Sequence, residues 1–260
     1  MSTVQNRRRR KKNTDLDKMS LIEHLTDLRK CLIIVIICFF IASLISFNFV
    51  QFFIDQLISL AVGYNFVYIS PSELIMQYIK VALLVAIVAT SPIILYQIWK
   101  FVCPGLKTRE KVTMFFAFLS GFVFFCIGLA FSFFIVIPIM LQFFLTIDTT
   151  HVIEPMITIA NYISFISSNL IIFGAIFEMP IITIVLTQLG LLKPQWLVKS
   201  RAIVAVVIFV IGAIITPPDV VSQILVAIPM LILYELSVVV CKLLEHRKRK
   251  RKKKLDLDDD

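Results

Sequence analysis

Charged residues are scarce in this sequence. Only 17% of the 260 residues are Asp, Glu, Lys or Arg, whereas 59% are hydrophobic, and the mean hydropathy is +0.92. Soluble globular domains contain about 25% charged and about 45–50% apolar residues. The composition therefore excludes a soluble globular protein and indicates an integral membrane protein. Because the apolar stretches are continuous and do not alternate with polar residues, they predict membrane-spanning helices and exclude a β-barrel.

Residues that could carry catalysis or bind a metal are equally sparse. The sequence contains no HExxH, GxSxG or glycine-rich phosphate-binding motif, and its three histidines lie far apart along the chain: His24, His151 and His246. The five cysteines lie in or beside apolar segments without a C-x-x-C pair, which predicts reduced thiols. We therefore expect no enzyme activity, no catalytic residues, no bound metal and no cofactor.

Six apolar runs follow one another along the chain, at 31–50, 74–98, 112–137, 157–188, 202–216 and 220–242. They predict an all-α, polytopic protein with six transmembrane helices. The fifth run would span only about 21 Å as a helix, less than the hydrocarbon core of about 30 Å. The sixth contains Pro229, so we expect both to be short. We divide the chain into a disordered basic arm (1–19), the six-span domain (20–242) and a charged cytosolic tail (243–260).

The basic residues lie on one side of these predicted spans. Apart from Lys80, every one of the 26 Lys and Arg residues falls before the first run, in the second-to-third and fourth-to-fifth connections, or from Lys242 onward. By the positive-inside rule, both termini are cytosolic. The basic clusters are typical of contacts with anionic membrane lipid. The net charge of +9 therefore does not predict binding to nucleic acid.

Two acidic residues stand among the basic residues of this predicted inner face. Asp27 lies in SLIEHLTDLRK, before the first span, and Glu110 is the acid of FVCPGLKTREK, between the second and third. Each has a structural explanation, as part of a solvated helical turn or as an acid that complements a helix N-terminus. The alternative is that each carboxylate receives a cationic partner.

Glu178, in FGAIFEMPI, lies about 15 Å inside the fourth span, near the middle of the bilayer. A carboxyl group at this depth is a candidate functional group, although an internal hydrogen bond between helices would also explain it. If it relayed protons, the chain could be a proton-coupled carrier of small solutes. The spans contain too few polar residues to line such a path, so we keep the carrier only as the alternative function.

The motifs taken in order resemble those of the TatC family, the receptor core of the twin-arginine protein translocase. The matching stretches are HLTDLRK, SPIILYQIWKFVCPGLKTREK, FGAIFEMPI and ITPPDVVSQILVAIPMLILYELS, and they cover roughly residues 20–242. The forms SPSEL and FEMPIITIVLTQLGLLKP are most similar to those of Gram-positive bacteria. The resemblance implies a concave, glove-like bundle in the bacterial cytoplasmic membrane, with the plastid thylakoid and mitochondrial inner membrane as alternatives.

The resemblance also implies a function, the export of folded proteins driven by the proton-motive force, and a site for the cargo's signal peptide. Asp27, which replaces the commoner Glu, and Glu110 would bind the two arginines of that peptide. The positions expected nearby are His24, Leu28, Arg29, Gln97, Phe101 and Pro104. Arginine suits such a site because its planar guanidinium group pairs with a carboxylate through two hydrogen bonds.

Further residues are assigned by the same resemblance to contacts with other subunits. Glu178 and Gln223 would form a polar site for single-span TatA- or TatB-type partners. Pro217, Pro218 and Asp219 would form an outer hairpin. The resemblance further implies assembly with other copies of the chain. The segment 51–60 lacks the proline common in the family, and Cys31 stands where many members have a basic residue.

Overall fold

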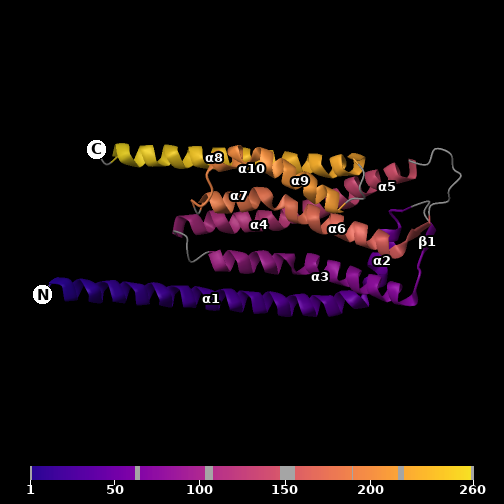
Figure 1. Cartoon of the computed structure of the whole chain (residues 1–260), viewed down its shortest axis with the longest axis horizontal. Coiled ribbons are helices and arrows are strands. Elements are labelled where there is room, and N and C mark those ends of the chain that lie inside the picture. The colour runs from indigo at the N-terminus through magenta and orange to yellow at the C-terminus, as the bar shows by residue number, and fades with distance from the viewer. Residues whose placement is uncertain are drawn as a thin grey trace.

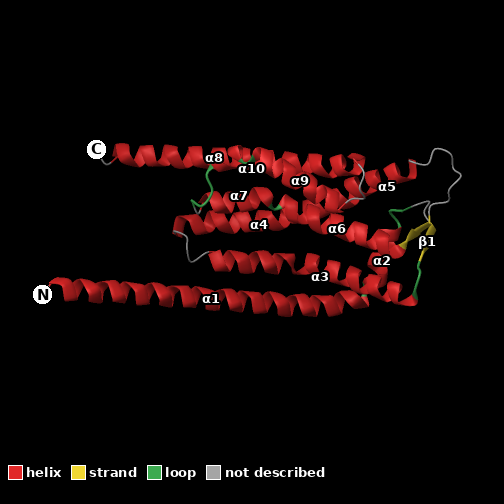
Figure 2. Cartoon of the chain, in the orientation of Figure 1, coloured by secondary structure: helices red, strands yellow, loops and turns green. Residues whose placement is uncertain are grey.

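The computed structural model describes most of the chain. It covers the backbone of residues 2–61, 65–102, 108–146, 156–188, 190–215 and 220–258, and the side chains of 25–61, 66–101, 115–144, 156–188, 190–214 and 220–246. Nearly all of this backbone is helical, which confirms the predicted all-α class (Figure 2). Two three-residue strands pair at one end of the helices.

The helices and strands follow one another in a simple order. They are α1 (Ser2–Asn48), α2 (Val50–Ile58), β1 (Asn65–Val67), α3 (Pro71–Val102), α4 (Thr108–Phe131), a π-helical turn η2 (Ser132–Val136), α5 (Ile137–Thr146), β2 (Met156–Thr158), α6 (Ile159–Phe177), α7 (Met179–Gln188), α8 (Pro194–Lys199), α9 (Arg201–Ile215) and α10 (Val220–Asp258).

Five helical segments of the described chain are long and apolar enough to cross a membrane. They are Leu25–Asn48, Pro71–Phe101, Phe115–Phe144, Ile159–Gln188 and Val220–His246, and Arg201–Ile214 is a shorter apolar helix. These segments coincide with the six predicted runs. The short fifth run is confirmed, but the prediction of a short sixth span is wrong, because its 27-residue segment continues through Pro229 without a break.

The helices lie side by side, with the N- and C-termini at the same end (Figure 1). α1 packs along α3, α4 packs along α6, and α10 packs against α7 and α9. α3 ends and α4 begins toward the end with the termini, and the strands lie at the opposite end (Figure 1). We call these the inner and outer ends. α1 begins at Ser2 and α10 ends at Asp258, so their backbones include the arm and the tail, whose disorder stays a prediction.

A small polar cap joins the outer ends of the helices. β1 pairs in parallel with β2, with Phe66 opposite Ile157. The Glu73 carboxylate accepts hydrogen bonds from the backbone N–H groups of Ile69, at 2.8 Å, and Ala160, at 3.3 Å, and so ties the first turn of α3 to the first turn of α6. The Tyr162 hydroxyl donates to the carbonyl of Leu57 at 2.6 Å and holds α2 in place.

The hydrophobic core has two parts. The first joins α2, α3, α5 and α6 around the fully buried Val81, Ile137 and Ile163, and the second joins α5, α6, α9 and α10 around Phe173 and Val226. Close packing of α4 on α6 depends on glycine. A Cβ atom at Gly128 would lie 2.6 Å from the carbonyl oxygen of Phe173, so no larger residue fits without moving a helix.

Two of the spans depart from regular α-helix. The fourth is interrupted at Glu178, between α6 and α7, because Pro180 has no N–H to donate to the preceding turn. The helix resumes when the Ile182 N–H donates to the Glu178 carbonyl at 2.9 Å. The third span contains the turn η2, in which the hydroxyl of Ser132 is fully buried with no hydrogen-bond partner. Such turns are frequent at functional sites.

Candidate functional site

The inner end of α1 presents an accessible carboxylate. Asp27 lies one helical turn from Lys30, and the Lys30 Nζ and Asp27 Oδ1 atoms are 3.7 Å apart. Both side chains are largely exposed, at 69% for Lys30 and 60% for Asp27. Arg29 and Leu28 are exposed beside them. An exposed pair at this distance contributes little to stability, so the carboxylate can readily accept a stronger partner.

The packing of α1 on α3 brings Asp27 toward the α3–α4 connection. The two helices run antiparallel and their outer ends lie side by side (Figure 1). From Asp27 to Asn48 an α-helix rises about 32 Å, whereas α3 is about 47 Å long, so Asp27 lies beside the inner half of α3. The backbone of Glu110 lies in the first turn of α4, directly after that connection. The side chains of Glu110 and His24, and the whole of Pro104, lie outside the described residues.

Gln97 lies close to the same end of α3. It is only 7% exposed, and its side-chain oxygen has no hydrogen-bond partner among the described residues. Buried amide groups are normally paired, because an unpaired group costs about 1–3 kcal/mol. Phe101, half-buried, follows one turn later. Among the described residues, the side-chain oxygen of Gln97 is therefore available to accept a hydrogen bond. It lies in α3, the helix that precedes Glu110 in the chain.

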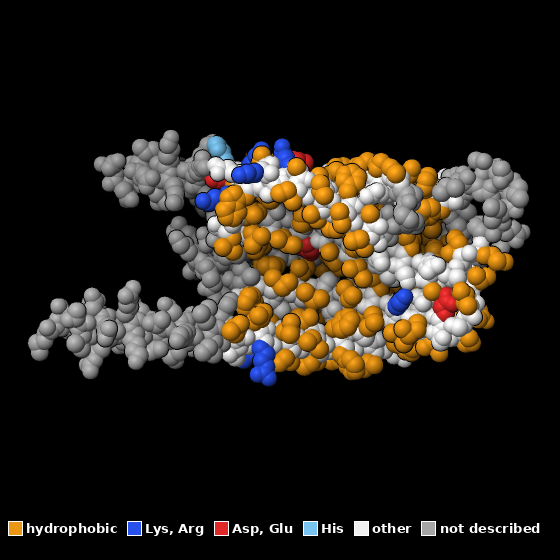
Figure 3. All heavy atoms as spheres, in the orientation of Figure 1, with side chains coloured by type: hydrophobic (Ala, Val, Ile, Leu, Met, Phe, Trp, Pro, Cys, Tyr) orange, Lys and Arg blue, Asp and Glu red, His pale blue; other side chains and the backbone are white. Residues whose placement is uncertain are grey.

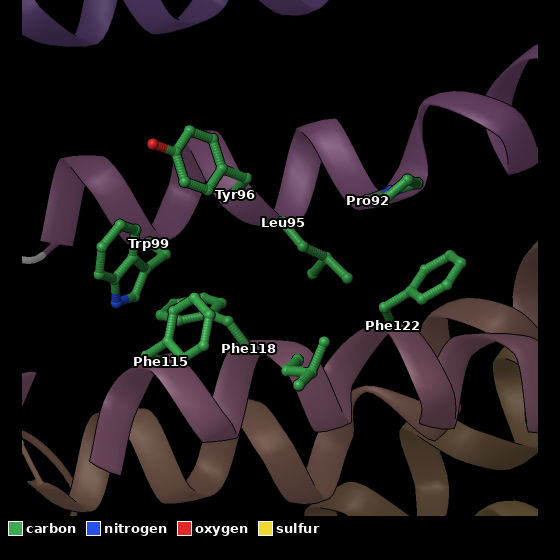
Figure 4. Close-up of a pocket in the computed structure, with 8 residues that line it drawn as sticks. Pro92, Leu95, Tyr96, Trp99, Phe115, Phe118 and Phe122 are labelled. Atoms are coloured by element: carbon green, nitrogen blue, oxygen red, sulfur yellow. The ribbon is translucent and has the colours of Figure 1, made fainter. Parts of the chain in front are cut away.

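An aromatic groove, absent from the predicted site, lies between the inner halves of α3 and α4 (Figure 4). It has a volume of about 170 Å³. Its lining residues are Pro92, Leu95, Tyr96 and Trp99 from α3, and Phe115, Phe118, Leu119 and Phe122 from α4. In each helix the four positions are spaced i, i+3, i+4 and i+7, the pattern of one helical face. This periodicity was the signal that could have revealed the groove.

Glu178 lies in the middle of the fourth span and packs against α4. A Cβ atom added to Gly121 would lie 3.0 Å from one carboxyl oxygen of Glu178, so glycine leaves room for this group. The other carboxyl oxygen is buried and has no hydrogen-bond partner among the described residues. The internal hydrogen bond that would explain Glu178 structurally is thus missing for that oxygen. An acidic patch is visible within the hydrophobic middle of the molecule in Figure 3.

Gln223, the second residue of the predicted polar site, lies against a different helix. Its side-chain nitrogen donates to the carbonyl of Phe209 in α9 at 2.9 Å, and its Cγ lies against Gly212. This bond braces the outer half of the short α9 on α10. Pro217, Pro218 and Asp219, which join these two helices, lie outside the described residues.

Other polar groups of the described spans form pairs with structural roles. Lys80 donates to the hydroxyl of Ser164 at 3.0 Å and links α3 to α6. Arg201 donates to Glu235 at 2.7 Å, where α9 begins beside α10. Within the described residues, no group of three or more His, Cys, Asp or Glu side chains could hold a metal ion.

The chain is similar to known proteins over most of its length. The sequence profile of the Sec-independent protein translocase protein (TatC) family matches residues 23–229. The TatC protein of Carboxydothermus hydrogenoformans is 40% identical over 233 residues, which are 88% of this chain and 96% of that protein. TatC of Aquifex aeolicus is 39% identical over 237 residues, 89% of this chain and 98% of that protein.

The fold agrees with the same relationship. A crystal structure of the twin-arginine translocase receptor TatC matches with a TM-score of 0.77 and 38% sequence identity, over 85% of this chain and 98% of that one. A second crystal structure of that receptor, in DDM, gives a TM-score of 0.78 at 39% identity, over 84% of this chain and 98% of that one. Sequence and fold lead to one conclusion: this chain belongs to the TatC family of Sec-independent protein translocase proteins.

Proposed function

We propose that the chain is the receptor of a twin-arginine translocase and binds signal peptides through Asp27 and Glu110. The observation that supports the proposal is the antiparallel packing of α1 on α3, which places the exposed carboxylate of Asp27 in the inner half of the bundle, the half in which α4 begins at Thr108 and has Glu110 in its first turn. The relatives with known structures are twin-arginine translocase receptors, and membership of the family makes this chain a translocase component.

The chemistry of both carboxylates suits a pair of arginines. Among the described residues the ion-pair partner of Asp27 is Lys30, at 3.7 Å, and a guanidinium group can displace that contact by forming two shorter hydrogen bonds. The backbone of Glu110 lies in the first turn of a helix, a position that favours a negative charge because the first backbone N–H groups of a helix have no intrahelical partner. Arginine keeps its charge and its planar geometry at any physiological pH, so a lysine pair would bind more weakly.

The proposal extends to the other subunits. Glu178 leaves a carboxyl oxygen unpaired in the middle of a span, and a polar residue on the helix of a TatA- or TatB-type partner would pair with it. Gln223 and the outer hairpin of Pro217, Pro218 and Asp219 would guide such a helix onto the short α9. Together with further copies of the chain, the complex would export folded proteins with the proton-motive force, from a cytosolic inner end of the bundle.

A proton-coupled carrier remains the alternative function. It would need a polar cavity near Glu178 that a solute can enter. Three cavities that described residues line have mainly apolar walls. This lining favours the receptor, whose cargo interacts with the surfaces of several subunits.

Crosslinking of a signal peptide to Glu110 variants tests the receptor function. Glu110→Lys should abolish photo-crosslinking of a twin-arginine peptide to the protein in membranes, and Asp27→Asn should weaken it, because each change removes a carboxylate from the proposed site. The matched control is Asp55→Asn, which removes an exposed acid of α2 near the outer end. Unchanged crosslinking and cargo export by a stably inserted Glu110→Lys protein would refute the proposal.

A further inference from the structure

We propose that the aromatic groove between α3 and α4 binds an anionic phospholipid of the inner leaflet. Part of one acyl chain lies between the helices, and the headgroup lies beside Lys100 and the indole N–H of Trp99. The groove lies between the inner halves of two segments long and apolar enough to span a membrane, where a lipid of that leaflet would reach it. This proposal does not depend on the binding of signal peptides.

The size of the groove suits a length of hydrocarbon chain. Its volume is about 170 Å³, and five of its eight lining side chains are aromatic. An apolar cavity of about 150 Å³ holds a molecule of the size of benzene, so the groove accommodates a segment of an acyl chain. In Figure 4 the side chains of Leu95 and Phe118 approach each other from the two helices, and Trp99 lies at the inner end of the groove.

The groove also contains a polar atom that has no partner among the described residues. Trp99 Nε1 is fully buried and donates no hydrogen bond to any of them. Its ring is held between Tyr96 and Phe115, with ring centroids 5.6 Å and 5.8 Å away, and the indole is turned toward α4 (Figure 4). A ligand that widens the groove with a hydrocarbon chain and also brings an oxygen acceptor would satisfy this N–H. A phospholipid brings both, and tryptophan commonly lies at the level of lipid headgroups.

Charge favours an anionic headgroup over a zwitterionic one. Lys100 is exposed one residue after Trp99 and forms no ion pair with any described residue. The sequence that follows adds Lys107, Arg109 and Lys111 against the single acid Glu110. The groove cannot distinguish lipids by their acyl chains, which are alike, so any selectivity among lipids must come from the headgroup. One basic group near the membrane surface favours an anionic lipid by a factor of about five.

The two tryptophans of the chain make the proposal testable by fluorescence. Trp196→Phe leaves Trp99 as the sole tryptophan. The full-length variant is reconstituted into vesicles that contain brominated phosphatidylglycerol or, at the same mole fraction, brominated phosphatidylcholine, since bromine quenches a tryptophan that it touches. We expect phosphatidylglycerol to quench Trp99 more strongly, with a relative affinity higher by a factor of about five or more.

Two further variants identify the source of the selectivity. In Trp99→Phe the reporter is Trp196, which is 58% exposed on α8, beside Lys193 and Lys199 and outside the groove, and adding Lys100→Gln should leave its quenching by the two lipids unchanged. Lys100→Gln, combined with Trp196→Phe, should reduce the preference of Trp99 for phosphatidylglycerol by about fivefold. Lys100 is a surface residue, so this change should not affect folding.

Three results would overturn the proposal. One is equal quenching of Trp99 by the two lipids, which would show contact with bulk lipid only. Another is a preference that persists unchanged in the Lys100→Gln variant. The third is that Trp99 is quenched by a twin-arginine peptide brominated in its apolar segment but not by brominated lipid. That result would assign the groove to the peptide. Because the lipid measurements need neither peptide nor export, their failure would leave the receptor function unaffected.

Discussion

Replacing Gly128 by alanine tests how closely α4 and α6 approach each other. The added Cβ would lie 2.6 Å from the carbonyl oxygen of Phe173 and 2.9 Å from the Cβ of Phe177, so the helices must separate or bend. Overpacking of this kind costs about 1–3 kcal/mol. Alanine returns up to about 1 kcal/mol through its better helix propensity. We therefore expect a net destabilisation of about 1–2 kcal/mol.

The measurement is thermal unfolding of the detergent-solubilised protein with a thiol-reactive dye. Cys241 is fully buried, so its reaction reports loss of the fold. The expected destabilisation lowers the midpoint by about 2–8 °C for a domain of this size. Gly212→Ala is the matched control, because its Cβ would meet its nearest neighbour, Gln223 Cγ, at 3.4 Å, and it should leave the midpoint unchanged or slightly raised. A Gly128→Ala protein as stable as this control would refute the reasoning.

Three further changes can be measured in the same way. Glu73→Gln removes the charge that receives two backbone N–H groups in the outer cap and should lower stability by about 1–2 kcal/mol; no change in the midpoint would contradict the role of the cap. Glu235→Gln breaks an exposed ion pair with Arg201 and should cost less than about 1 kcal/mol, so a larger loss would contradict the small contribution expected of an exposed pair. Gly190→Ala should cost about 1–2 kcal/mol, because Gly190 has a φ of +76°, where a residue with a side chain is strained. The cost is backbone strain alone, since no described atom lies within 4 Å of an added Cβ. An unaltered midpoint would rule out that strain.

Much of the fold follows from local sequence features. The six apolar runs predict the membrane-crossing helices because a helix is the one structure that pairs every backbone group of a continuous segment within lipid. Pro180 predicts the interruption next to Glu178. The sixth span was misjudged because Pro229 was given too much weight; a proline removes one hydrogen bond, and α10 continues on either side of it.

The candidate site could be predicted only in part. Glu110 was found because it is the only acid in the two inner connections of the sequence, and both Glu110 and Asp27 because their motifs resemble those of a known family. The aromatic groove was missed although both of its helices carry the i, i+3, i+4, i+7 pattern. The reason is physical: in a membrane protein apolar side chains face lipid as well as the core, so periodicity does not identify the face that packs.

The sequence by itself determined the class of the protein, the number and position of its apolar helices, the side on which its basic residues gather and the family to which it belongs. These properties depend on residues that are close together in the chain. Only the tertiary structure decided which helices are neighbours: that α1 lies along α3, that Glu178 faces Gly121 and that Trp99 leaves an unpaired N–H in a groove. Such contacts join residues far apart in the chain, and they depend on the shapes of packed side chains, which neither composition nor periodicity records.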